Sequence, residues 1–150
     1  MAKEKKPSQE VVVEGDYQSL TQKITLGPHQ ITADEPTDAG GDDRGPSPYE
    51  LLLASLGACT SMTILLYAKR KGWEIRRVTV WLAHQKIYAQ DCQDCETKDG
   101  YLDHIERRIH IDGNLDDEKR ERLLNIANRC PVHQTLTHEI KIDTKLTERA

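Results

Sequence analysis

The longest apolar stretch of the chain covers residues 51–68. None of these residues is charged, and the cations at 69–71 follow, with Gly72 after them. Residues 47–50 read Ser-Pro-Tyr-Glu, which is the order of an N-cap, a first-turn proline and a capping-box glutamate. Cations in the last turn and a glycine after it are typical of a helix C-terminus. The pattern therefore predicts one helix, which would span roughly 27 Å at 1.5 Å per residue.

A helix without a polar side is covered on all sides, by lipid or by protein. Serines, threonines and Gly57 dilute this stretch, and no second such segment occurs in a chain with a mean hydropathy of -0.69. We therefore expect a helix in a protein core and no membrane partner. A chain of 150 residues has little else to cover it. This shortage predicts a homodimer with the helix near its interface.

Alternating apolar and polar positions predict strands on both sides of this helix. The expected strands are a pair within 11–33 around the turn Gly27-Pro28, a strand at 78–83, its antiparallel partner at 105–111, and a closing strand at 139–145. A second helix is predicted over 117–129, and its buried side would consist of Leu123, Leu124, Ile126 and Ala127. This order of elements predicts an α+β domain.

We expect a disordered lead over residues 1–10 and a single domain over 11–150. The lead is charged and lacks the apolar core of a secretory signal, so we expect a cytoplasmic protein. Residues 34–48 form a loop rich in turn-forming residues, and we interpret it as a lid or as an arm that reaches across a dimer. The net charge of -4 and the scattered basic residues argue against a nucleic-acid partner.

Two of the four cysteines, Cys59 and Cys130, lie in segments that are predicted to be helical. A buried thiol without a positive neighbour is usually inert core material. Pro131 follows Cys130 directly and cannot continue a helix, so the Cys130 sulfur should lie near a helix end, where it can face a second cysteine. In the cytoplasm, paired cysteines more often indicate redox catalysis or metal binding than a permanent disulfide.

Long blocks of the sequence resemble the OsmC/Ohr superfamily of osmotically inducible and organic-hydroperoxide-resistance proteins. The blocks are GPSPYELLLASLGACT, YAKRKGW and GNLDDEKRERLLNIANRCPVHQTL, and the likeness extends over roughly residues 24–144. The CPVH motif makes the chain most similar to the general OsmC-like branch. The resemblance implies antiparallel sheets around a long buried central helix, in an intertwined homodimer that requires no cofactor.

The resemblance also implies a cysteine-based peroxidase. Cys59 would attack an organic hydroperoxide, Cys130 would resolve the sulfenic acid as a disulfide, and an external dithiol would reduce that disulfide. The family places an arginine and a glutamate beside the attacking cysteine. Glu50 lies about one position later than the glutamate of the classical branch, and a capping box alone explains it. Arg44 is the substitute for the arginine, with Arg129 as an alternative.

Cys92 and Cys95 form a separate CxxC in a polar hairpin tip. This spacing fits a zinc site, a redox pair, or exposed thiols with a loose disulfide, and a zinc ion would need two further ligands, such as His84 or His104. Two alternatives to the peroxidase therefore stay open. One is a catalytically weak ligand-binding or stress-associated domain, and the other is a dimer stabilised by zinc at Cys92 and Cys95.

Overall fold

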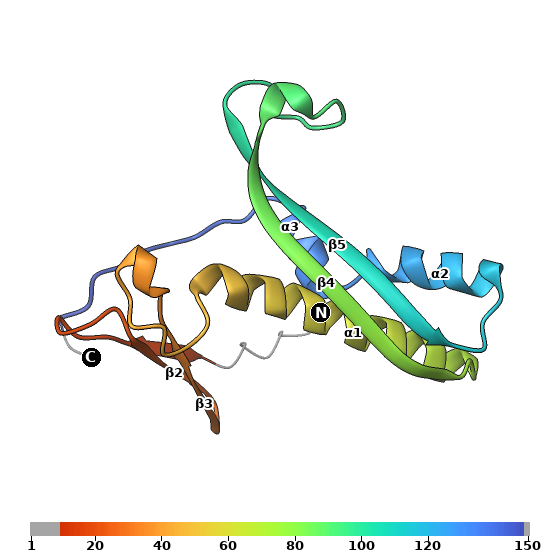
Figure 1. Ribbon diagram of the computed structural model, residues 1–150, viewed down its shortest axis with the longest axis horizontal. Helices are drawn as coiled ribbons and strands as arrows, with labels where there is room; N and C mark the ends of the chain where they lie inside the picture. Colours follow the sequence, from red (N-terminus) through yellow and green to blue (C-terminus); the bar gives the residue numbers. More distant parts are fainter. Residues whose placement is uncertain (1–9, 149–150) are drawn as a thin grey trace, which may run out of the picture. The chain divides into compact units, whose positions relative to one another are not determined.

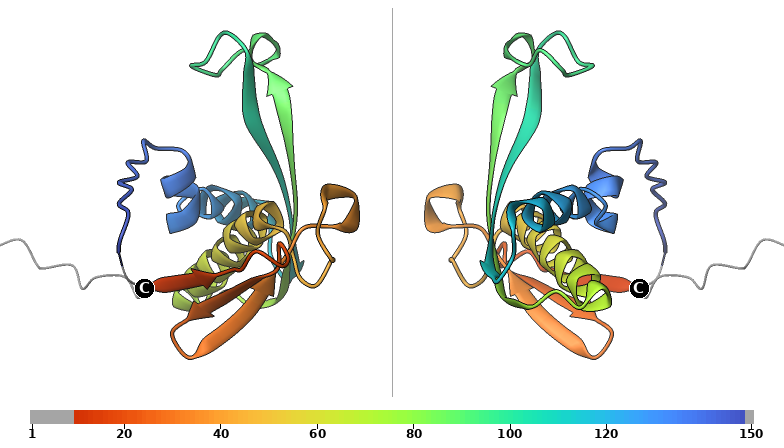
Figure 2. Two further views of the ribbon diagram at one scale, coloured as in Figure 1. Left: turned by 90° about the vertical axis from the view of Figure 1, so that its left-hand side faces the viewer. Right: turned by 90° about the vertical axis from the view of Figure 1, so that its right-hand side faces the viewer.

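The computed structural model describes residues 10–148, and the chain divides between Leu52 and Leu53 into two compact units (Figures 1 and 2). Each unit is described by itself. The predicted lead over residues 1–10 lies, except for Glu10, outside the described residues. The single domain over 11–150 stays a prediction.

The first unit contains a three-stranded antiparallel sheet in the order β1-β2-β3. Its elements are β1 (Val11–Glu14), β2 (Gln22–Leu26), β3 (His29–Ala33) and the short 3₁₀ helix η1 (Thr37–Ala39). Val13, Ile24 and Ile31 lie side by side in the register, and Gly27 has the positive φ of 60° that its turn requires. The region predicted as one strand pair therefore forms three strands.

The loop after β3 is held by polar contacts. The buried carboxylate of Asp34 accepts hydrogen bonds from the backbone N–H of Glu35 (2.8 Å) and of Arg44 (3.2 Å), and from the Thr21 hydroxyl (3.0 Å). Burial raises the pKa of Asp34, but the hydrogen bonds outweigh burial and lower it. A Cβ on Gly45 would meet the backbone of β3, so only glycine fits there. The role of this loop as a lid or arm stays a prediction.

The long helix α1 (Pro48–Lys71) is confirmed, and so are both of its ends. The backbone N–H of Glu50 donates to Ser47 Oγ at 3.3 Å, and Glu50 Oε2 accepts from the backbone N–H of Ser47 at 2.7 Å. Gly72 ends the helix with a φ of 69°, and the N–H of Trp73 donates to the Ala68 carbonyl. Only one stripe of α1 is buried within the chain, namely Leu56, Gly57, Thr60, Ile64 and Ala68.

The second unit contains the rest of α1 and one long β-hairpin, which Figure 1 shows as a twisted ribbon. Its further elements are β4 (Ile75–Tyr88), η2 (Ala89–Asp91), β5 (Tyr101–Gly113), α2 (Asp117–Ala127) and α3 (Pro131–Leu136). The core joins α1, β5 and α2 through Ile64, Ala68, Ile111, Leu123 and Ala127. On α1, Gly57 lies so near Leu82 of β4 that a Cβ would come within 2.7 Å of that side chain.

The predicted second helix is confirmed, although it ends at Ala127 and not at Arg129. Two other expectations for the C-terminal half are wrong. Leu124 is 55% exposed, because it lies off the stripe formed by Leu123, Ile126 and Ala127. The strand predicted over 139–145 is not formed: these residues have no regular structure. The alternation of Ile140 and Ile142 is present, but both are exposed and no strand pairs with them among the described residues.

The contrast between Leu123 and Leu124 provides a stability test. Leu123 is fully buried, so Leu123→Ala should lower the free energy of unfolding by about 2–5 kcal/mol, because it removes apolar contacts and leaves a cavity. The matched variant Leu124→Ala should cost less than about 1 kcal/mol. Urea denaturation monitored by circular dichroism measures both values, and equal losses would contradict this placement of α2.

Candidate functional site

Cys130 lies at the point where the chain turns from α2 into α3. Its side chain is fully buried, and its sulfur accepts a hydrogen bond from the backbone N–H of His133 at 3.2 Å. The same sulfur lies 3.9 Å from the hydroxyl oxygen of Thr60 on α1. The sequence-based expectation that Pro131 leaves the sulfur at a helix end is confirmed.

Thr60 is the link between this sulfur and α1. Its hydroxyl donates to the carbonyl of Leu56 at 2.7 Å and accepts from Arg107 Nη1 at 2.9 Å. A hydroxyl has a single hydrogen, which is used here on Leu56. In its thiol form, Cys130 therefore has the S–H that is left to donate to the Thr60 oxygen.

Arg107, on β5, holds the cluster together. Its Nη2 donates to Asn128 Oδ1 at 2.8 Å and lies 3.3 Å from Nδ1 of His133. Burial, and then the charge of Arg107, lower the pKa of His133, so its imidazole is neutral at pH 7 and can accept from the guanidinium. Among the described residues no carboxylate forms an ion pair with Arg107. Its positive charge is therefore left to act on other groups.

Arg107 and Thr60 were missed by the sequence analysis, although the sequence contains a signal for each. Arg107 has the same strand parity as Ile105, Ile109 and Ile111, so an arginine stands within the apolar part of a face that also carries Asp103 near the hairpin tip. Thr60 lies four residues after Leu56 on the stripe that is buried. A charged or polar residue at a core position needs a partner, and these two residues are partners for each other.

A cavity of about 400 Å³ opens beside the guanidinium. Leu56, Ile105 and Leu136 supply apolar walls. The polar part of the lining comes from Arg107, His133 and Thr137, and from the carboxylate of Asp103. This combination of an apolar lining and a few directed polar groups is typical of a small-molecule site. It suits a ligand with a hydrocarbon part and a polar end.

Cys59 is the residue directly before Thr60 on α1. It is partly exposed, and both it and Cys130 are free thiols. The contact between Thr60 and Cys130 places the buried sulfur against the helical turn that carries Cys59. The structure therefore brings Cys130 to the segment of Cys59, without a bond between the two sulfurs.

The predicted assisting residues have contacts of their own. Arg44 and Glu50 belong to the first unit, where the Glu50 carboxylate completes the capping box. Arg44 lines a polar cavity of that unit together with Glu14 and Lys23. Arg129, the alternative cation, is exposed and lines a different cavity from that of Arg107.

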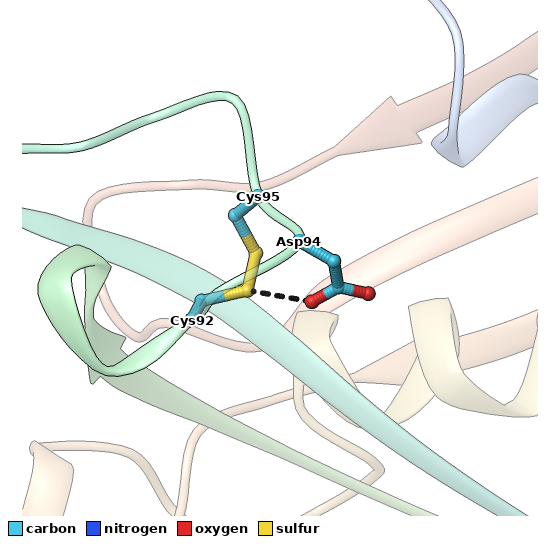
Figure 3. A group of neighbouring side chains, drawn as sticks. All are labelled: Cys92, Asp94 and Cys95. Atoms are coloured by element: carbon cyan, nitrogen blue, oxygen red, sulfur yellow. Dashed lines mark hydrogen bonds between the residues drawn. A yellow bond between two sulfur atoms is a disulfide. The ribbon is translucent and has the colours of Figure 1, made fainter.

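Cys92 and Cys95 form a disulfide at the hairpin tip, with their Cα atoms 5.5 Å apart (Figure 3). Of the alternatives named for this pair, the structure carries the disulfide, and a zinc or redox role of the two cysteines stays a prediction. The histidines that were considered as zinc ligands are engaged further down the hairpin, His84 with Asp103 at 2.8 Å and His104 with Gln85 at 3.4 Å.

The sequence model of the family described as OsmC-like protein matches residues 40–145 of the chain. The chain belongs to this family. The match includes Cys59, Cys92, Cys95 and Cys130 of this OsmC-like protein, together with Arg107 and Thr60. The resemblance noted from the sequence is therefore confirmed. Comparison with curated proteins gave no match.

Solved structures share the fold of this OsmC-like protein. An OsmC-like protein from Mycoplasma pneumoniae is 22% identical, with a TM-score of 0.67 and coverage of 89% of each chain. The organic hydroperoxide resistance protein OsmC of Legionella pneumophila is 19% identical, with a TM-score of 0.63 and coverage of 88% of this chain and 92% of that one. OhrB of Bacillus subtilis, an organic hydroperoxide resistance protein, is 21% identical, with a TM-score of 0.59 and coverage of 85% of this chain and 89% of that one. The predicted α+β class is confirmed.

Proposed function

We propose that this protein reduces organic hydroperoxides in the cytoplasm, with Cys59 as the attacking thiol and Cys130 as the resolving thiol. The observation that carries the proposal is the contact of the Cys130 sulfur with Thr60, which joins a buried thiol, the Arg107 guanidinium and the turn of Cys59. Family membership supports it, as does the fold shared with the hydroperoxide resistance proteins of L. pneumophila and B. subtilis.

The proposed reaction has three steps. The Cys59 thiolate attacks the distal oxygen of ROOH, the O–O bond breaks, and the products are a Cys59 sulfenic acid and ROH once the alkoxide takes up a proton. The Cys130 sulfur then attacks the sulfenic sulfur of Cys59, and a Cys59–Cys130 disulfide forms. The displaced hydroxide takes up the proton of the Cys130 thiol and leaves as water. An external dithiol returns both thiols to the reduced state and is itself oxidised to a disulfide.

The burial of the two cysteines supports these two roles. A thiol that meets substrate needs access, and Cys59 is partly exposed, whereas Cys130 is fully buried. The burial of Cys130 keeps its sulfur away from peroxide, and its contact with Thr60 places it against the turn of Cys59, where it can react with the sulfenic acid. Rapid trapping protects Cys59 from the irreversible sulfinic state.

Arg107 is proposed to position the peroxide. Its guanidinium lines the cavity beside Leu56, Ile105 and Leu136, so an alkyl or aryl group can lie on the apolar walls while the peroxide oxygens accept from the guanidinium. Developing negative charge on the leaving oxygen would be stabilised by the same donors. Arg44 and Glu50 remain proposed assisting residues, and substitution of each one would test that role.

Mass spectrometry after brief exposure to cumene hydroperoxide tests the proposed chemistry. The reduced wild type should lose two hydrogens and form a Cys59–Cys130 disulfide. Cys130→Ser should instead accumulate an over-oxidised Cys59, because the resolving thiol is missing. Cys59→Ser is the matched control and should stay unmodified at Cys130.

An unchanged mass at Cys59 and Cys130 in all three proteins would contradict the peroxidase. It would favour the alternative of a ligand-binding or stress-associated OsmC-like domain. Peptides that contain Cys92 and Cys95 are scored separately, so that oxidation of the hairpin tip is not counted as peroxidase chemistry.

We also propose that the protein works as a homodimer, because α1 has an uncovered apolar side. Met62, Leu65 and Leu66 are 62%, 40% and 65% exposed, and the most apolar window of the helix is only 22% buried. By length and composition alone, α1 could cross a membrane. Its other side, however, packs against Leu123 and Ala127 in a protein core, which favours a second copy of the chain as the cover.

Sedimentation in detergent-free buffer measures the predicted assembly. The wild type should sediment at twice the chain mass of 17.1 kDa, and Leu66→Glu should shift it toward the monomer by placing a charge in the apolar interface. Tyr17→Glu, at a fully exposed position, should leave the dimer intact. A monomeric wild type, or one that needs detergent to stay in solution, would contradict the dimer.

A further inference from the structure

The tip of the β4–β5 hairpin is a fixed frame. The paired strands end at Tyr88 and Tyr101, whose rings lie 4.5 Å apart. Beyond them, the N–H of buried Ala89 donates to the carbonyl of Gly100 at 2.8 Å, and the N–H of Cys92 donates to the carbonyl of Ala89 at 3.1 Å. These contacts hold the backbone at Cys92 in one position.

This frame brings three metal-binding atoms together. One ligand atom each from Cys92, Asp94 and Cys95 lies within 4.8 Å of the others, and Figure 3 shows the Asp94 carboxylate turned toward the sulfur of Cys92. Asp94 Oδ1 and Cys92 Sγ are 3.3 Å apart. A disulfide sulfur has no hydrogen to donate, so the approach of the carboxylate is favourable only when a proton or a cation lies between them.

We propose that reduced Cys92 and Cys95, together with Asp94, bind a thiophilic divalent cation of the Zn²⁺ type, and that the disulfide closes this site. Two thiolates two residues apart are the half-site spacing of many zinc centres, and a carboxylate oxygen is an accepted third ligand. Water would complete the four-coordinate shell.

The charge of the tip agrees with a cation. Residues 89–100 contain four acidic residues and a single lysine. That lysine, Lys98, donates to the carbonyl of Cys95 at 2.5 Å and so is directed to the backbone. The acidic field alone would disfavour thiolates, and a bound dication compensates for it.

The histidines of the same hairpin do not complete the site within one chain. His84 is four residues before the end of the ladder at Tyr88, which corresponds to about 13 Å along a strand. Its Nε2 is bonded to Asp103. The donor set therefore consists of two sulfurs and one oxygen.

Binding and closure exclude each other chemically. Metal binding releases one proton from each thiol and leaves both sulfurs as ligands. Oxidation of the dithiol by an organic hydroperoxide removes two electrons and two protons: the S–S bond forms, the O–O bond breaks, and ROOH becomes ROH and water. A dithiol reductant reverses the closure by thiol–disulfide exchange. The tip would hold metal under reducing conditions and release it during peroxide exposure.

Competition of the full-length protein with a chromophoric chelator for Zn²⁺ tests this site. The reduced wild type should bind one ion per chain, and the air-oxidised wild type should bind none at the tip. Cys92→Ser should abolish binding, and Asp94→Asn should weaken it by about tenfold or more. The double variant Cys59→Ser/Cys130→Ser is the matched control and should retain the ion, with circular dichroism confirming that each variant is folded.

Cadmium supplies a second measurement that needs no substitution. Reduced wild type should develop sulfur-to-cadmium charge-transfer absorption that disappears on oxidation and remains in the Cys59→Ser/Cys130→Ser protein. The proposal is overturned if reduced wild type binds no ion, if oxidised protein binds equally well, or if binding survives Cys92→Ser but is lost with the buried pair.

Discussion

The hydrogen bonds of the Arg107 guanidinium join four separate segments of the second unit. From β5, Arg107 reaches Thr60 on α1, Asn128 after α2 and His133 on α3. All three partners are neutral, and within residues 10–148 no carboxylate forms an ion pair with this cation. The position of Cys130 follows from this arrangement, because its sulfur contacts two of the same residues.

The same interaction connects the fold to the proposed chemistry. A buried thiol in apolar surroundings is inert, and the apolar stripe of α1 alone would make Cys130 such a thiol. Thr60 interrupts that stripe with one hydroxyl. This hydroxyl contacts both the Arg107 guanidinium and the Cys130 sulfur, next to the turn that carries Cys59. The cavity beside the guanidinium adds apolar walls for a hydrocarbon group. The hairpin tip has its own pair of cysteines, and the metal binding proposed there does not involve Cys59 or Cys130.

The elements that the sequence predicted correctly are those with local signals. Capping residues at both ends located α1, and alternation located β4 and β5 (Figure 1). The prediction of a strand over 139–145 was wrong because alternation in the sequence does not reveal whether a second strand is available for pairing. Among the described residues, no strand pairs with this segment. Arg107 was missed because its hydrogen-bond partners lie 47 positions before it and 26 after it. Attention to a charge on an apolar strand face would have found it.

The rate of Cys59 oxidation by cumene hydroperoxide, followed by stopped-flow with rapid alkylation, tests the role of Arg107 most directly. Arg107→Met should lower the second-order rate constant by about 10²-fold, and Arg107→Lys should recover part of it, because charge returns without the fork of donors. Arg76→Met, at an exposed arginine that is paired with Asp112, is the matched control for a cation outside the cluster, and melting temperatures check that each variant is folded. An unchanged rate in folded Arg107→Met, or an equal loss in Arg76→Met, would contradict the account.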